Sequence, residues 1–153
     1  MSLWDALPAQ ACVFSGPGVN HEGERFVGRL ELQPLLNKGA YLIHYTATRD
    51  DGAHLHQEAT LLGRNETGAL CRWPVMEELP FILPHVEIGA TSSRSGEFVA
   101  IFASGPREQT ASFREEIRLE VWPDGRWVYA HAWGMPGESF EQRSSCALFP
   151  QAS

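Results

Sequence analysis

Three side chains with the chemistry of metal ligands, His54, His56 and Glu58, occupy alternate positions in the segment 51–64. Alternate residues of a strand share one face of a sheet, so these three are expected to form a row. Neutral imidazoles and a carboxylate are ligand types that suit Zn or Fe. The row is therefore either a ligand site or a solvated surface.

The neighbours of this row favour the solvated surface. Leu55, Ala59 and Leu61 alternate with the row and make the better core face, so we expect the histidine row to face solvent. Two alternatives stay open, namely a polar contact inside a pocket and a metal site completed by His44 or His131. The pattern alone does not favour a metal.

The segment 111–133 contains the clearest hairpin signal in the chain. Its centre, residues 122–125 (Trp-Pro-Asp-Gly), has Pro second and Gly fourth, as in a type I turn followed by a glycine bulge. In that register the facing pairs are Val121 with Trp127, Leu119 with Tyr129, Ile117 with His131, and Glu115 with Trp133. A two-residue Asp-Gly turn is the alternative, and it would point Val128, Ala130 and Ala132 inward instead.

The first register gives an interior that is lined by aromatic and ionisable side chains rather than by aliphatic ones. Buried Trp, Tyr and His need partners for their polar atoms, and such surfaces are typical of a cavity that holds a small ligand. The candidate ligand-binding residues are Trp127, Tyr129, His131, Trp133, Glu115 and Trp73. The alternative is a filled barrel in which Glu115 and His131 satisfy one another.

Other reactive side chains lie in no recognisable catalytic motif, so catalytic residues stay unassigned. His85 follows Pro84 and is expected at the surface or in a loop, while Cys71 and Cys146 have the pattern of small apolar core residues. The segment 16–18 (Gly-Pro-Gly) lacks the spacing of a phosphate-binding loop, and no Ser or Cys lies in a nucleophile elbow. Common hydrolases and nucleotide enzymes are therefore disfavoured.

The elements that must position these side chains are short extended runs separated by turn residues. About nine to ten strands are expected after residue 24, with no helix long enough for a βαβ crossover. They cover residues 26–33, 40–48, 53–63, 69–73, 85–92, 97–103, 111–122, 126–133 and 140–149. Strands in series tend to close because closure removes exposed edges, so we predict an all-β, antiparallel up-and-down barrel. A two-sheet sandwich is the alternative.

The remaining segments carry weaker patterns. The length predicts one domain over residues 1–153. Residues 1–24 are weakly patterned, with a helical turn at 3–7 and a loop at 15–18. Residues 74–84 are bounded by prolines and are expected to form a lid-like loop.

Charge and composition disfavour several classes of partner. The net charge of −7 at pH 7 argues against a nucleic-acid backbone or an anionic membrane surface. No apolar run reaches the roughly 18 residues that a membrane span needs, and no signal peptide is recognisable. Three cysteines without CxxC spacing fit reduced thiols, so we expect a cytoplasmic protein. A homodimer stays open as an alternative to a monomer.

Several local motifs carry a family resemblance. The segment 55–58 (Leu-His-Gln-Glu), followed by 62–64 (Leu-Gly-Arg), resembles the His-x-Glu strand of nitrobindin, a haem-binding barrel, and residues 127–145 resemble its final hairpin. More broadly, the pattern is similar to the calycin superfamily of lipocalins and fatty-acid-binding proteins, and to bacterial fatty-acid-binding-protein-like barrels of uncharacterised function. The resemblance implies a barrel with a pocket. The haem-ligating His of nitrobindin would fall near Arg143, where residues 142–148 contain no His.

Two functions of different classes follow from these patterns. The favoured one is a non-enzymatic binding protein that holds a small apolar or amphipathic molecule, oriented by His131 and Glu115. The alternative is a haem- or metal-binding barrel, with acid-base or isomerase-type activity. It would use His131 or His56 together with Glu58 or Glu115. Neither haem nor Zn is favoured as a cofactor by the sequence.

Overall fold

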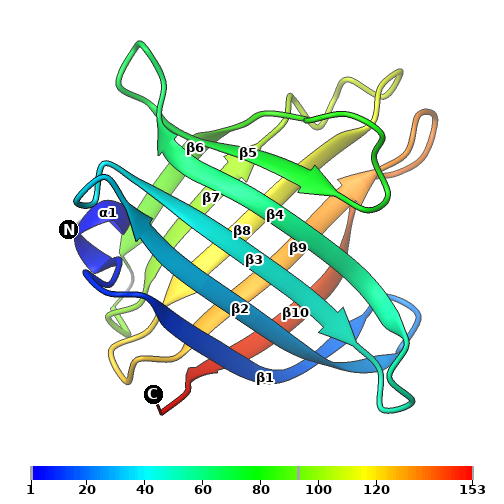
Figure 1. Cartoon of the computed structure of the whole chain (residues 1–153). Helices are drawn as coiled ribbons and strands as arrows, with labels where there is room; N and C mark the ends of the chain where they lie inside the picture. Colours follow the sequence, from blue (N-terminus) through cyan, green and yellow to red (C-terminus); the bar gives the residue numbers. More distant parts are fainter. Residues whose placement is uncertain (1, 93, 153) are drawn as a thin grey trace.

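Ten antiparallel strands close into a barrel, seen from the side in Figure 1. The computed structural model describes residues 2–92 and 94–152. The elements are α1 (Leu3–Ala6), β1 (Cys12–Asn20), β2 (Arg25–Leu35), β3 (Ala40–Thr48), β4 (His54–Arg64), β5 (Leu70–Met76), β6 (His85–Ser92), β7 (Phe98–Ala103), β8 (Arg114–Val121), β9 (Trp127–Gly134) and β10 (Glu141–Pro150). No helix in the described ranges has the length and apolar character needed to cross a membrane.

The strand order confirms the up-and-down barrel. Each strand pairs with the strands before and after it in the chain, and β1 pairs with β10 to complete the wall, which excludes an open two-sheet sandwich. Along β2 and β3 every second residue is buried, as expected for a wall with one face toward the core. These inward residues are Phe26, Gly28, Leu30, Leu32, Tyr41, Ile43, Tyr45 and Ala47.

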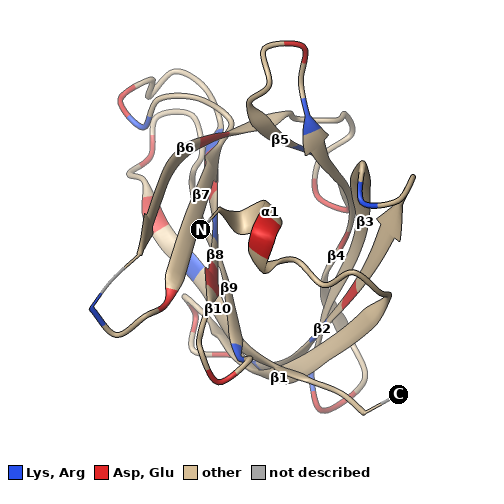
Figure 2. Cartoon of the chain, turned by 90° about the vertical axis from the view of Figure 1, so that its left-hand side faces the viewer, with Lys and Arg blue, Asp and Glu red and all other residues tan. Residues whose placement is uncertain are grey.

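The helix α1 lies across one end of the barrel, which Figure 2 shows along the barrel axis. The Ser2 side chain caps the helix by accepting from the backbone N–H of Asp5, and Leu3 is buried beneath the helix. Trp4 meets Tyr41 edge-on, with ring centroids 5.2 Å apart. We call the end of the barrel that α1 covers the closed end. The packing below α1 leaves a void of about 10 Å³, the room of one water molecule.

The first strand is absent from the sequence-based prediction, in which residues 15–18 form a loop. These residues belong to β1, where Gly16 and Gly18 allow neighbouring parts of the barrel to approach closely. A Cβ atom on Gly16 would lie 1.9 Å from the carbonyl oxygen of Ala147 on β10, and one on Gly18 would lie 2.3 Å from the Phe26 ring. The glycines therefore serve packing between strands rather than a turn.

The hairpin of β8 and β9 has the register that its turn chemistry predicts. The backbone N–H of Trp122 donates to the carbonyl of Arg126 at 2.8 Å, and Gly125 adopts a φ of 87°. The facing pairs are Val121 with Trp127, Leu119 with Tyr129, Ile117 with His131, and Glu115 with Trp133. The type I turn with a glycine bulge is confirmed, and the two-residue alternative is wrong.

The ladder between β5 and β6 is short. It has two residue pairs, Cys71 with Val86 and Arg72 with His85. Beyond these pairs β5 continues through Pro74 to Met76, although the sequence pattern predicts that the strand stops before the proline. Proline has no backbone N–H to donate, and here it lies where β5 has no partner on the β6 side.

Candidate functional site

The barrel contains a cavity of about 550 Å³ at the end opposite α1, where the end of β1 and the turn that follows it contribute Asn20 and His21 to its lining; we call this the open end. Much of its wall is apolar, with Phe26, Leu55, Met76 and Phe113 among the lining side chains. The polar lining residues are Asn20, His21, Tyr45, His56, Glu78, Glu115, His131, Arg143 and Ser144. The volume falls in the range of small-molecule binding pockets, which is roughly 300–1,000 Å³.

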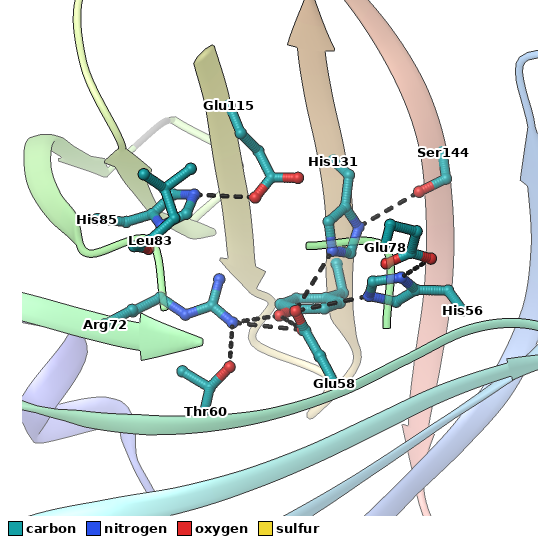
Figure 3. Close-up of polar contacts among 11 residues, drawn as sticks. His56, Glu58, Thr60, Arg72, Glu78, Leu83, His85, Glu115, His131 and Ser144 are labelled. Atoms are coloured by element: carbon teal, nitrogen blue, oxygen red, sulfur yellow. Dashed lines mark hydrogen bonds and ion pairs between the residues drawn. The ribbon is translucent and has the colours of Figure 1, made fainter. Parts of the chain in front are cut away.

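Glu58 is the centre of a buried polar cluster (Figure 3), and two members of this cluster, His56 and His131, line the cavity. The residue is 2% exposed, and its Oε1 accepts a hydrogen bond from the Tyr129 hydroxyl and faces Arg72 Nη2 at 3.4 Å. The same guanidinium nitrogen donates to Thr60 Oγ1 at 3.3 Å and to the Tyr129 hydroxyl. Burial raises the pKa of Tyr129 well above its ordinary value, so the hydroxyl stays protonated and donates. These partners compensate the buried carboxylate.

Two imidazoles lie beside Glu58 and line the cavity. The Nε2 atoms of His56 and His131 lie 3.6 Å and 3.9 Å from Glu58 Oε2. Their Nδ1 atoms have other partners, Glu78 Oε1 at 2.8 Å for His56 and Ser144 Oγ at 3.3 Å for His131. We call His56, Glu58 and His131 the floor cluster. Three titratable side chains thus meet at the bottom of an apolar cavity.

The floor cluster holds compensating charges. Burial would raise the pKa of Glu58, but the two neighbouring imidazoles and the Arg72 guanidinium hold it well below its ordinary value. Burial would likewise lower the pKa of His56, but the carboxylates of Glu58 and Glu78 raise it to about 10. An anionic Glu58 therefore lies next to a protonated His56, and the floor offers groups that can donate or accept hydrogen bonds.

A second buried pair joins β6 to β8. His85 is 0% exposed, and its Nε2 lies 2.9 Å from Glu115 Oε1 while its Nδ1 lies 2.7 Å from the carbonyl of Leu83 (Figure 3). The prediction that His85 lies at the surface or in a loop is wrong, because an inward carboxylate on another strand supplies its partner. The pairing of Glu115 with His131, expected for a filled barrel, is replaced by this contact.

Three of the predicted ligand-binding residues, His131, Trp133 and Glu115, line the cavity. Tyr129 lies deeper, where it bonds Glu58. Trp127 points inward but belongs to the closed end, where it stacks on Phe14 with ring centroids 4.3 Å apart. The inward aromatic side chains of β9 are therefore divided between a packed core, which contains Trp127, and a cavity wall, which contains Trp133.

Trp73 does not line the cavity. It pairs with Leu61 across the ladder between β4 and β5, and facing residues of a ladder share one side of the sheet. Leu61 is 43% exposed, so this side is the outside of the barrel. The inward residues of β5 are Leu70, Arg72, Pro74 and Met76, all of them buried.

The predicted solvent-facing row is correct at His54 and wrong at His56 and Glu58. His54 is exposed, whereas His56 lines the cavity and Glu58 is buried. The apolar face expected inside lies partly outside, because long-range partners make the polar face the more stable one to bury. His44 is exposed as well, so the sets that include His54 or His44 are not assembled.

An irregularity in the ladder between β3 and β4 separates the two histidines. Ala47 pairs with His56 and Thr48 with His54, which leaves Leu55 as an extra residue. Both Leu55 and His56 line the cavity, so the alternation of the strand is interrupted there. The sequence-based assumption that residues 54–58 alternate strictly between two faces cannot detect this shift.

Some residues of the site were not predicted. Arg72 carries a sequence signal, since it alternates with Leu70 and Met76, and an inward cation requires an inward carboxylate. Glu78 and Ser144 carry none, because one lies in a loop and the other is polar on a strand with mixed burial. Their contacts with the histidines depend on the closure of the barrel.

The chain resembles a solved structure along almost its whole length. Rv2717c from M. tuberculosis superposes with a TM-score of 0.69, covering 98% of this chain and 97% of that one at 13% sequence identity. No protein-family model matches the sequence, and the curated proteins contain no significant match. At this identity the likeness shows the fold, a ten-stranded antiparallel barrel.

Proposed function

We propose that this protein is a calycin-type barrel that binds a small apolar or amphipathic molecule in the cavity at the open end. The observation that carries the proposal is the cavity of about 550 Å³, whose largely apolar wall ends on a buried ionisable floor. A packed barrel core would have no such space, as the closed end of the same barrel demonstrates.

The cavity wall suits the apolar part of a ligand. Phe26, Leu55, Met76, Phe113 and Trp133 present aromatic and aliphatic surface to the space. Each 100 Å² of apolar ligand surface removed from water there would contribute roughly 2.5 kcal/mol, before the entropic cost of association. The wall therefore favours a ligand with an apolar body.

The rim of the cavity is also apolar. Leu79, Phe81 and Met135 line the cavity close to solvent, and Phe81 and Met135 are 55% and 44% exposed. Exposed apolar side chains around a concave site often mark the surface that a ligand crosses. A ligand can therefore stay in contact with apolar groups from solvent to floor.

The floor favours an uncharged polar head group. The charges of Glu58 and Arg72 compensate one another, and the protonated His56 lies between Glu58 and Glu78. A head group that brings a charge of its own would disturb this balance, whereas a hydroxyl or carbonyl can bond His131 at the floor of the cavity. We infer that an amphipathic ligand enters with its polar end toward His131.

Filling the cavity tests this function. An indole placed inside by Ala47→Trp should weaken binding of the uncharged, largely apolar dye Nile red by at least about tenfold, because Ala47 lines the cavity. The matched control is Leu61→Trp, which adds an indole to the outside of the same wall. Dye fluorescence titrations measure both affinities, and circular dichroism checks that each variant folds.

Equal dye affinity in the wild type and in a folded Ala47→Trp variant would contradict the proposal. Native mass spectrometry of the wild-type protein gives a second readout. A co-purified molecule that is apolar or amphipathic supports the proposal, and a molecule that is highly charged opposes it.

A further inference from the structure

Three ligand-type atoms of the floor cluster converge on one point without bonding one another. The donor atoms of His56, Glu58 and His131 all lie within 4.8 Å of one another. Glu58 Oε2 is 3.6 Å from His56 Nε2 and 3.9 Å from His131 Nε2, distances that are long for hydrogen bonds. Both imidazole nitrogens therefore face the same carboxylate oxygen at ion-pair distances without forming hydrogen bonds to it.

The same three atoms lack hydrogen-bond partners. His56 Nε2, Glu58 Oε2 and His131 Nε2 are buried, and none has a partner among the residues that the structure describes. The side chains of Glu58 and His131 are 0% and 7% exposed. Buried polar atoms are normally paired, so three unpaired atoms that face one another indicate a missing shared partner.

We propose that the floor cluster binds one divalent transition-metal ion through His56 Nε2, Glu58 Oε2 and His131 Nε2. This site goes beyond the proposed binding of an apolar molecule and does not depend on it. The ion takes the place of the proton on His56 Nε2, which leaves to solvent when the metal binds.

The atoms that are not proposed as ligands are already engaged, which fixes the orientation of each ligand. His56 Nδ1 contacts Glu78, and His131 Nδ1 contacts Ser144. Glu58 Oε1 accepts from Tyr129. Metal-bound histidines and carboxylates typically have such outer partners, which orient the ring and hold its tautomer.

The spacing fits an ion after small side-chain rotations. Bonds of about 2.0–2.2 Å at tetrahedral angles place neighbouring ligand atoms roughly 3.3–3.6 Å apart. The separations from Glu58 Oε2, 3.6 Å and 3.9 Å, are at or slightly above this range. All three atoms lie within 4.8 Å of one another, so side-chain rotation would have to bring them to bonding distance of one ion.

The ligand set selects the class of metal. Two imidazoles and one carboxylate suit Zn²⁺ or Fe²⁺, whereas Ca²⁺ and Mg²⁺ require mainly oxygen ligands. His56 and His131 line the cavity, so a fourth position would face the space where a small molecule binds.

Zinc titration of the chelator-treated protein tests the site. We expect isothermal titration calorimetry to show one Zn²⁺ per chain in the wild type. His56→Gln and His131→Gln should each weaken binding by more than about 100-fold, since even an outer partner of a metal ligand is worth roughly 10- to 100-fold. His54→Gln and His44→Gln, which change exposed histidines on β4 and β3, are the controls and should bind as the wild type does.

Absence of stoichiometric Zn²⁺ binding to the wild type would overturn the proposal even if a variant failed to fold. So would unchanged binding in folded His56→Gln and His131→Gln proteins, or an equal loss in His54→Gln. Dye titration of the same samples separates the two proposals. Dye binding without Zn²⁺ binding removes only the metal site, and Zn²⁺ binding without dye binding removes only the apolar ligand.

Discussion

The closed end and the open end of the barrel are built from the same ten strands, yet they are filled differently. Below α1, apolar side chains such as Leu30, Ile43 and Trp127 pack around a void of about 10 Å³. At the other end the same wall encloses about 550 Å³ above a floor of ionisable residues. Strand β9 runs through both regions, and it contributes Trp127 to the first and Trp133 to the second.

The two ends of the barrel therefore have different roles, one in stability and the other in forming the cavity. Dense apolar packing stabilises the fold at the closed end, where buried aliphatic and aromatic side chains form most of the interior. The open end includes a cavity and buried charges, which are costly unless they are paired. The molecule can carry such a site because the other half of its interior is a conventional core.

The largest expected effect comes from the two tryptophans of β9. Trp127→Ala should lower the free energy of unfolding by about 3–5 kcal/mol, because it opens a hole in a dense core. Trp133→Ala should cost about 1 kcal/mol or less, since Trp133 is half-buried and already borders an open space. Denaturation in guanidinium chloride measures both values. Equal losses would show that the two ends are packed alike.

An intermediate effect is expected from two buried tyrosine hydroxyls. Tyr129→Phe removes a donor to Glu58 and should cost about 1.5–3 kcal/mol, as for hydrogen bonds to charged groups. Tyr41→Phe is the matched change at the closed end, where the hydroxyl donates to the carbonyl of Pro8 at 3.1 Å. Its cost should be about 0.5–1.5 kcal/mol. A Tyr129→Phe protein as stable as the wild type would mean that Glu58 and Arg72 compensate one another without the hydroxyl.

The closed barrel could be predicted because its signals are local. The turn at residues 122–125 sets the register of β8 and β9, and with it the inward direction of Trp127 and His131. Short connections between strands then favour serial antiparallel pairing. The strand β1 escaped prediction since glycine and proline usually mark loops, and only contact with β10 explains Gly16.

The candidate site could be predicted only in part because its partners are distant in the sequence. His131 and Glu115 were identified from the hairpin, but the residue that pairs with Glu115 is His85, on another strand. The orientation of Glu58 depends on Tyr129, which lies 71 positions later in the chain. Ranking the faces of β4 by apolarity fails when such partners make the polar face the buried one.

The smallest expected effect concerns two arginines that stack on tryptophans at opposite ends of the barrel. The Arg143 guanidinium lies 4.3 Å from the ring centroid of Trp133, and that of Arg64 lies 5.6 Å from the ring centroid of Trp4. Arg143→Ala and Arg64→Ala should each cost about 0.5–1 kcal/mol of stability at these partly exposed sites.

The two arginine variants should differ in ligand binding rather than in stability. Arg143 lines the cavity, and its Nε donates to the carbonyl of Trp133 at 3.1 Å. Its loss removes the contact that holds Trp133 in place in the cavity wall. Dye affinity should therefore fall about two- to fivefold in Arg143→Ala, which corresponds to less than about 1 kcal/mol. Arg64→Ala should leave it unchanged, because Arg64 and Trp4 lie at the closed end. If both variants weakened dye binding equally, the affinity would depend on the stability of the whole barrel, and the separation of core and cavity would be wrong.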